Sequence, residues 1–434
     1  MSKAIFRRIA AGTAACAVLA AGVAIPFGAF AQQNEQGGML FQFRFAERLQ
    51  FRDSDSPDPE ENGQTTQLTT DLGLSFSSET RTEALSADFD AGYRLIDGPT
   101  TDGVTGEFMS PRLNLSYSQA AATASFDVSA TASRAELSEI SPLEASTNEE
   151  DALPPDFAEL TDAGTRDQIG FDARLSLRDD APFGIILGAG VNDISFTNLP
   201  AGSGLRDRTN GRLYAVGRFD VSKVMQVRSR LQYDIADKDG EELVERFGLS
   251  SRATLLRPDG NYRVSGSVSG GDGGEQAGLS FGRLIERPKM SVDVDFGLSQ
   301  SATDGFYVTG NAEYSYAFGQ QSVLGTVTAS AERFLRFANG ADEDLVTSLS
   351  VGSNYALSPL ATIAITAQVA QAETLLTGER VDLAQARISV GYDLSRDWRA
   401  SAGLRTEWRD PSNDVSSEST SLSLSFSRSF DLRR

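Results

Sequence analysis

Hydrophobic and polar residues alternate with a period of two along most of the chain. In the segment 68–76, Leu68, Leu72 and Phe76 fall on one side, whereas Asp71 and Ser75 fall on the other. A β-strand sends successive side chains to opposite faces, and an α-helix does not. The same alternation recurs in many further segments, among them 85–95, 169–178, 292–298 and 398–409. The pattern predicts strands throughout and no helix beyond the apolar N-terminal segment.

The length of the alternating segments separates a soluble sheet from a membrane sheet. Strands of soluble domains typically have about five or six residues, whereas a tilted strand needs ~9–11 to cross a bilayer. The segments here often run for about ten to fifteen residues. This length favours strands that span a membrane, with the apolar face toward lipid and the polar face toward a wet interior.

The connections between the segments form two kinds. Short turns rich in Pro, Gly and Asp occur at 222–223, 258–260, 287–288, 319–320, 358–359 and 395–397. Between them lie more polar connections of variable length, namely 53–64, 97–107, 139–165 and 410–418. Short turns at one rim and longer loops at the other are typical of outer-membrane barrels.

The alternation predicts a closed, antiparallel, all-β transmembrane barrel of about twenty strands, within a range of about 18–22. The predicted strands are 39–51, 66–78, 83–96, 108–118, 121–137, 166–178, 183–197, 210–221, 224–236, 242–256, 261–270, 276–286, 289–301, 305–318, 321–337, 344–357, 360–375, 382–394, 398–409 and 419–432. A soluble sandwich of this size would normally split into domains joined by linkers, and no linker is evident. A β-solenoid would show a tighter repeat than these hairpins, whose lengths drift.

The last predicted strand contains the stretch SLSLSFS at 421–427. Leu422, Leu424 and Phe426 share one face, and serines occupy the other. We expect the leucine face to meet lipid and the serine face to line a channel. Pairing of this strand with the first one, near Phe41–Phe45, would close the barrel.

The N-terminal segment reads as a signal peptide. Lys3, Arg7 and Arg8 precede an apolar run over 9–25, and Ala29-Phe30-Ala31 matches a small-x-small cleavage site. Residues 1–31 are therefore predicted to be the signal and 32–434 the barrel. An uncleaved membrane anchor is the alternative, but Pro26 interrupts the run. Cys16 lies within the apolar run and not after it, which argues against a lipidated cysteine.

Composition limits the chemistry available. The formal net charge is −21, the chain has no histidine, and Cys16 is its one cysteine. Histidine is the usual general base and a common metal ligand, so its absence argues against an enzyme. The pairs Asp88/Asp90 and Asp293/Asp295 place carboxylates ~7 Å apart on one strand face, but such pairs are ordinary solvated charges in a wet lumen. We expect no enzymatic activity, no cofactor and no metal site.

The charges on the polar faces point to a channel wall. If the apolar faces meet lipid, acidic side chains line the first third of the barrel and arginines the middle strands. This arrangement would create a transverse field across a water channel, or the charges would pair between neighbouring strands and stiffen the wall. The candidate pore-lining residues are Asp88, Asp90, Asp127, Asp172, Arg212, Arg218, Arg228, Arg230 and Arg252.

The connection 139–165 is acidic and contains no basic residue before position 165. Folded inward opposite the arginines, it would form a constriction that favours cations. The alternative is a solvated outer surface bridged to lipopolysaccharide by divalent cations. The candidate constriction residues are Glu144, Glu149, Glu150, Asp151 and Asp156.

Aromatic residues near the strand ends predict girdles at headgroup level. These residues are Tyr93, Phe108, Phe183, Phe196, Tyr355, Tyr392, Trp398 and Trp408.

Two hairpin phrases carry a family resemblance. YALSPLATIAITA at 355–367 and YDLSRDWRASAGLR at 392–405 share a Tyr-x-Leu-Ser turn entry followed by an alternating strand. They resemble porin-like outer-membrane barrels, in particular the family found with exopolysaccharide and capsule systems of Gram-negative bacteria. The resemblance implies a Gram-negative outer membrane and no enzymatic site. Such barrels usually end on an aromatic residue that the assembly machinery reads, whereas Phe430 here is followed by four more residues.

The expected function is passive diffusion of small polar solutes or ions through an outer-membrane porin-like channel, with a preference for cations as the sharper hypothesis. Export of exopolysaccharide and a structural or adhesive role without transport are the alternatives. Expected partners are membrane lipid, lipopolysaccharide, the barrel-assembly machinery and small solutes, but not nucleic acid, and a homo-oligomer stays open. The sequence does not identify the solute.

Overall fold

The computed structural model describes residues 38–55, 62–99, 104–137, 164–178, 181–199, 205–272, 274–302, 305–320, 323–337, 343–412 and 416–433. They form a twenty-stranded sheet, in agreement with the strand number predicted from the sequence. The strands are β1 (Gly38–Asp55), β2 (Gly63–Glu79), β3 (Glu83–Asp97), β4 (Thr105–Ala121), β5 (Ala124–Glu136), β6 (Thr165–Leu177), β7 (Phe183–Thr197), β8 (Arg208–Ser222), β9 (Met225–Lys238), β10 (Val244–Arg257), β11 (Gly260–Gly271), β12 (Gly274–Arg287), β13 (Met290–Gln300), β14 (Phe306–Gln320), β15 (Val323–Phe337), β16 (Glu343–Ser358), β17 (Ala361–Thr374), β18 (Arg380–Asp393), β19 (Trp398–Pro411) and β20 (Ser417–Arg433). Each is at least as long as a tilted bilayer crossing requires. In this part of the chain, no helix is long and apolar enough to cross a membrane.

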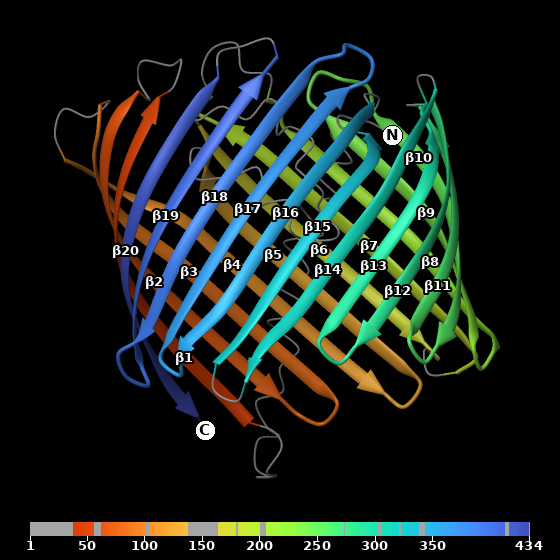
Figure 1. Cartoon of the computed structure of the whole chain (residues 1–434), viewed down its shortest axis with the longest axis horizontal. Coiled ribbons are helices and arrows are strands. Elements are labelled where there is room, and N and C mark those ends of the chain that lie inside the picture. Colours follow the sequence, from red (N-terminus) through yellow and green to blue (C-terminus); the bar gives the residue numbers. More distant parts are fainter. Residues whose placement is uncertain are drawn as a thin grey trace.

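Every strand pairs antiparallel with its neighbours in sequence, and β1 also pairs with β20, which closes the sheet into a barrel. Figure 1 shows the strongly tilted strands forming one continuous wall. Among the twenty described strands, closure leaves no unpaired edge, as a membrane-spanning sheet requires. The signal peptide predicted over 1–31 lies outside the described residues.

The closing pair has a different register from the one expected. Leu422, Leu424 and Phe426 lie opposite Phe51, Leu49 and Glu47 of β1, and not opposite Phe41–Phe45. The segment Phe41–Phe45 instead faces residues 428–432, beyond the serine-rich stretch. The physical reason is that alternation fixes the face of a strand but leaves its shift along the neighbour free in steps of two residues.

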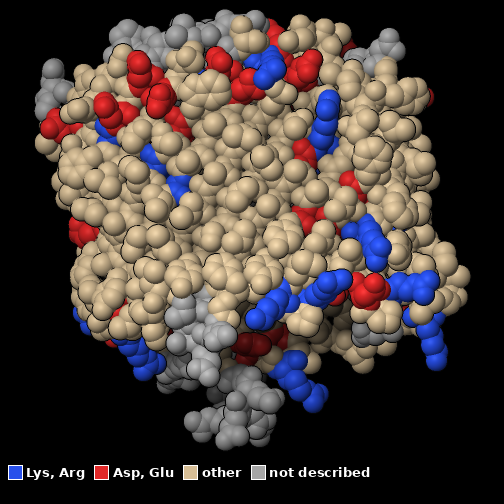
Figure 2. All heavy atoms as spheres, viewed as in Figure 1, with Lys and Arg blue, Asp and Glu red and all other residues tan. Residues whose placement is uncertain are grey.

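The two faces of the wall differ in composition. Leu422, Leu424 and Phe426 leave 44%, 46% and 40% of their surface exposed, and their partners on β1 and β19 are apolar except for Glu47, which lies opposite Phe426. Large apolar side chains are exposed on the corresponding face all around the barrel. Figure 2 shows one side of this outer surface, where a broad, mostly uncharged belt lies between rims that carry most of the charged side chains, and a few charges interrupt the belt on the right. An exposed apolar belt between charged rims is suited to a bilayer.

Strand β4 contains a bulge that the alternation did not reveal. Gly92 lies opposite Met109, whereas Asp90 lies opposite Arg112, so β4 has one more residue than β3 between these pairs. Ser110, inside the bulge, has φ 42°, and Pro111 follows it. Proline cannot donate to a sheet ladder and is found at such irregularities. The bulge turns Glu107 and Met109 to the same face as Arg112 although their positions differ by odd numbers.

Candidate functional site

The inner face of the barrel carries the predicted pore-lining residues. The strand registers place Asp88, Asp90, Asp127 and Asp172 on the face opposite the exposed apolar belt. The five predicted arginines lie on the same inner face of β8, β9 and β10. The structure therefore brings the acidic and basic groups to one lumen, on different arcs of its wall.

The acidic arc is partly neutralised by arginines of β1. Arg44 forms an ion pair with Asp90, and the Arg48 guanidinium lies 3.8 Å from an oxygen of Asp71. Arg44 belongs to β1 and Asp90 to β3, so their side chains cross β2 over Gly73. A Cβ at position 73 would lie 2.6 Å from Asp90 Oδ1. In this arc, charges paired between strands hold the wall together, which is one of the two arrangements predicted.

A second ion pair that crosses an intervening strand over a glycine occurs on the other side of the barrel. Arg263 of β11 donates to both Asp293 and Asp295 of β13, with its Nη1 2.7 Å from Asp293 Oδ2. The side chains cross β12 over Gly282, where a Cβ would lie 1.9 Å from Asp295 Oδ1. The pair Asp293/Asp295, considered above as a carboxylate pair, is thus held by one guanidinium. In the described ranges, no group of three or more Cys, Asp or Glu residues is placed to hold a metal ion.

The arc formed by β8, β9 and β10 is dominated by positive charge. Arg218, Arg228 and Arg252 lie directly opposite one another on three adjacent strands. Arg230 is two residues further along β9, with its guanidinium carbon 4.3 Å from the centre of the Tyr214 ring. Further along the wall, Arg212 pairs with Asp234 at 3.0 Å. This row of arginines thus lies on a different arc of the wall from the acidic residues Asp88, Asp90, Asp127 and Asp172.

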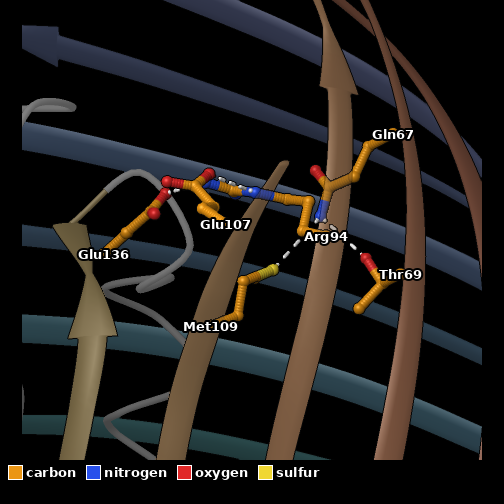
Figure 3. Close-up of polar contacts among 6 residues, drawn as sticks. All are labelled: Gln67, Thr69, Arg94, Glu107, Met109 and Glu136. Carbon is orange, nitrogen blue, oxygen red and sulfur yellow. Dashed lines mark hydrogen bonds and ion pairs between the residues drawn. The ribbon is translucent and has the colours of Figure 1, made fainter. Parts of the chain in front are cut away.

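A buried polar cluster lies on the inner face at the long-loop end of β2–β5 (Figure 3). Arg94 is 5% exposed, and its Nε donates to Glu107 Oε1 at 2.8 Å. Its Nη2 forms ion pairs with both Glu107 and Glu136. This guanidinium ties β3 and β4 to the end of β5, at the base of the connection 138–163. Buried charges require such partners, because isolated ones pay a large desolvation penalty.

Beside Arg94, Gln67 reaches over the neighbouring buried side chains. Its Nε2 donates to Thr69 Oγ1 at 3.0 Å and lies 4.0 Å from the Met109 sulfur. Thr69 and Met109 are 4% and 7% exposed. The inner face of β2–β4 is therefore packed at this height, although a twenty-stranded barrel is wide enough to enclose an open channel.

An apolar cluster crosses the lumen at the long-loop end. One part of it comes from the β5–β8 side and contains Leu137 and Leu205, 2% and 1% exposed. The other part comes from β16, β17 and β18 and comprises Val346, Ala370, Ala372, Val381 and Leu383. These two groups of strands are about ten positions apart in the twenty-stranded ring, so they lie on opposite walls. The cluster narrows the lumen from both sides.

Phe196 was predicted to belong to an aromatic girdle and does not. It packs against this lumen cluster together with Leu199 and Phe334. Alternation alone sets Phe196 at a strand end, and the tertiary structure turns it inward because the lumen at this height is apolar. The predicted constriction residues Glu144, Glu149, Glu150, Asp151 and Asp156 lie outside the described residues.

Sequence reasoning missed Arg94, Arg44 and the apolar cluster. The signal for the cluster was present in the polar face of β16–β18, where Val346, Ala370 and Leu383 interrupt a face that is otherwise rich in polar side chains. An apolar residue on the wet face of a barrel strand indicates a contact inside the lumen.

The closed wall, the apolar belt and the polar lumen define a transmembrane β-barrel of the kind found in bacterial outer membranes, as predicted from the sequence. No family model matches the chain, and no curated protein matches it by sequence.

Three solved structures illustrate the likeness in fold. The siderophore receptor PirA from Pseudomonas aeruginosa is 11% identical, with a TM-score of 0.47 over 89% of this chain and 80% of that one. The outer membrane protein opdK from the same organism is 12% identical, with a TM-score of 0.42 over 90% and 99%. OccAB4 from Acinetobacter baumannii is 10% identical, with a TM-score of 0.41 over 92% and 100%. The resemblance to exopolysaccharide and capsule barrels receives no support from these comparisons.

Proposed function

We propose that the protein is an outer-membrane channel for passive diffusion of small polar solutes or ions. The observation that carries the proposal is the inner wall, which presents charged and hydroxyl side chains around a closed ring of twenty strands. A ring of this number exceeds the size at which side chains fill the interior. The lumen cluster narrows the channel at the long-loop end and sets the size of what passes.

A preference for cations is the finer hypothesis, and it depends on the acidic loop residues Glu144–Asp156. The described wall gives no support to this preference, because Arg228, Arg230 and Arg252 bring positive charge to the lumen on β9 and β10. Aromatic side chains for sugar stacking, which export of polysaccharide would favour, are few on the inner face, where Tyr214 and Tyr307 lie.

The orientation is part of the same proposal. Exposed basic residues mark the short-turn rim, among them Lys223, Arg257, Lys289 and Arg396. We place this rim in the periplasm, where it would meet phospholipid headgroups, and the long loops outside, where lipopolysaccharide is the neighbouring lipid. Insertion by the barrel-assembly machinery follows from the class of protein, and association of several copies is left open.

Planar-bilayer conductance of the purified full-length chain tests the function. We expect discrete ion-conducting steps in symmetric salt, and a reversal potential in a salt gradient that reports the sign of the favoured ion. The folded state of the protein is checked by the change in its gel mobility on heating. If the folded protein gives no conducting events, the proposed channel function is refuted. A reversal potential that indicates selectivity for anions would refute the cation preference. It would not contradict the proposed channel function.

A further inference from the structure

We propose that the inner wall of β8–β10 holds a binding site for a small oxyanion, a carboxylate or a phosphate group, near the periplasmic end of the lumen. This inference rests on the proposed channel function and names the class of solute that the channel handles. Its centre is the row Arg218, Arg228 and Arg252, together with Arg230 directly above it on β9.

The first argument is the register. Arg228 lies opposite Arg218 on one side and opposite Arg252 on the other. Like charges directly opposite one another on neighbouring strands destabilise a sheet. Nothing in the fold requires this alignment, since Ser265 occupies the next position in the same row on β11. A bound anion between the guanidiniums removes the repulsion.

The second argument is the shortage of carboxylates around the row. Asp220 lies 3.6 Å from Arg218, while Arg228 Nε donates to the neutral Gln226 at 3.1 Å. Within the described part of the chain, no carboxylate lies within ion-pair distance of Arg228, Arg230 or Arg252. Several other inner-wall arginines form ion pairs with carboxylates, as Arg263 does with Asp293 and Asp295.

The third argument is the state of the guanidiniums. Arg228 and Arg252 are exposed to the lumen, so their terminal N–H groups are accessible to a solute. Arg230 is held over Tyr214, and its buried Nε makes no hydrogen bond. Gly248 on the inner face of β10 leaves room above the row, since a Cβ there would meet no atom closer than 3.9 Å.

These features suit an oxyanion in particular. A guanidinium presents two parallel N–H groups that match two oxygens of a carboxylate or a phosphate, and it stays charged at every accessible pH. The guanidiniums of Arg228, Arg230 and Arg252 on two adjacent strands can thus share one oxyanion, whereas chloride uses only their charge. The expected solutes are small organic acids or phosphorylated molecules, which the test below distinguishes.

The test uses the full chain in planar bilayers and in detergent. In bilayers, inorganic phosphate or acetate is added to a constant chloride background, and the concentration that halves the chloride current is measured. In detergent, the shift of Tm with phosphate is compared with sodium chloride of the same ionic strength. The variant is Arg228→Gln/Arg230→Gln/Arg252→Gln. The control is Arg257→Gln, five positions from Arg252 on the same strand and on the opposite face.

We expect phosphate, acetate or both to inhibit the current through the wild-type channel. Phosphate should also raise the Tm of the wild-type protein. Each guanidinium removed should weaken the interaction roughly tenfold, and Arg257→Gln should leave it unchanged. The oxyanion that binds more tightly identifies the solute class. Equal inhibition and equal Tm shifts in the wild type and the triple variant would overturn the site while the channel stands. If the wild-type protein carries no current, the channel function is refuted. The binding site is then tested by the Tm shift with phosphate alone, compared between the wild type and the triple variant.

Discussion

Arg263 and Asp295 form an ion pair across an intervening strand, directly above a glycine. The guanidinium starts on β11, the carboxylate on β13, and Gly282 of β12 lies beneath them. Arg44 and Asp90 repeat the arrangement over Gly73. In both places, the absence of one Cβ allows two long side chains to lie flat on the lumen wall and to link three strands.

Gly282→Ala should therefore destabilise the barrel. The new Cβ would lie 1.9 Å from Asp295 Oδ1, so the carboxylate must move away from Arg263. Because the pair is partly buried, we expect a loss of about 1–2 kcal/mol in the free energy of unfolding, measured by urea titration in lipid vesicles. Gly266→Ala is the matched control, since its Cβ would meet no atom closer than 3.7 Å. Equal stability of the two variants would contradict the role assigned to Gly282.

The face of the closing strand can be tested with one charge placed at two adjacent positions. Leu424→Arg puts a guanidinium on the lipid face near mid-strand and should cost about 2–4 kcal/mol of stability. Ser423→Arg puts the same group into the lumen and should cost less than about 1 kcal/mol. Folding yield into vesicles and urea titration measure both. A larger loss for Ser423→Arg would reverse the assignment of inside and outside.

Arg94→Met should destabilise the long-loop end of β3–β5, because Glu107 and Glu136 lose their shared cation. We expect a loss of about 2 kcal/mol, less than for a fully buried pair because both carboxylates keep some exposure to water. Adding Glu107→Gln and Glu136→Gln to Arg94→Met should recover most of the loss. A triple variant as unstable as Arg94→Met would show that packing of the arginine stem, and not its charge, stabilises this region.

Loosening the lumen cluster should widen the channel. Leu383→Asp introduces a charge among Val346, Ala372 and Val381, so the two walls would separate at this height and water would enter. We expect a higher single-channel conductance, or more frequent transitions between conductance levels, in planar bilayers. Leu383→Met keeps volume and polarity and should conduct as the wild type does. Unchanged conductance in Leu383→Asp would show that the cluster does not limit the flow.

Much of the architecture could be predicted from the sequence, because the alternation of apolar and polar residues within each strand indicates the environment of its two faces. Leu422, Leu424 and Phe426 against the intervening serines suffice to predict a strand, its length and its lipid face. The same reasoning put Asp88, Asp90 and the five predicted pore-lining arginines of β8–β10 on the inner face. The bulge at Ser110 was missed, since Pro111 is its sole local sign and one extra residue shifts the alternation without breaking it.

The sequence by itself determined the strands, their number and the face each turns to lipid, because a period of two is a local property of the chain. The tertiary structure alone decided which side chains meet. The shift between β1 and β20, the passage of Arg263 over Gly282 and the alignment of Arg218, Arg228 and Arg252 all depend on how far neighbouring strands are offset. The packing of Leu205 and Phe196 in the same cluster as Val346 and Leu383 depends on closure, which brings strands about ten positions apart in the ring to face each other across one lumen.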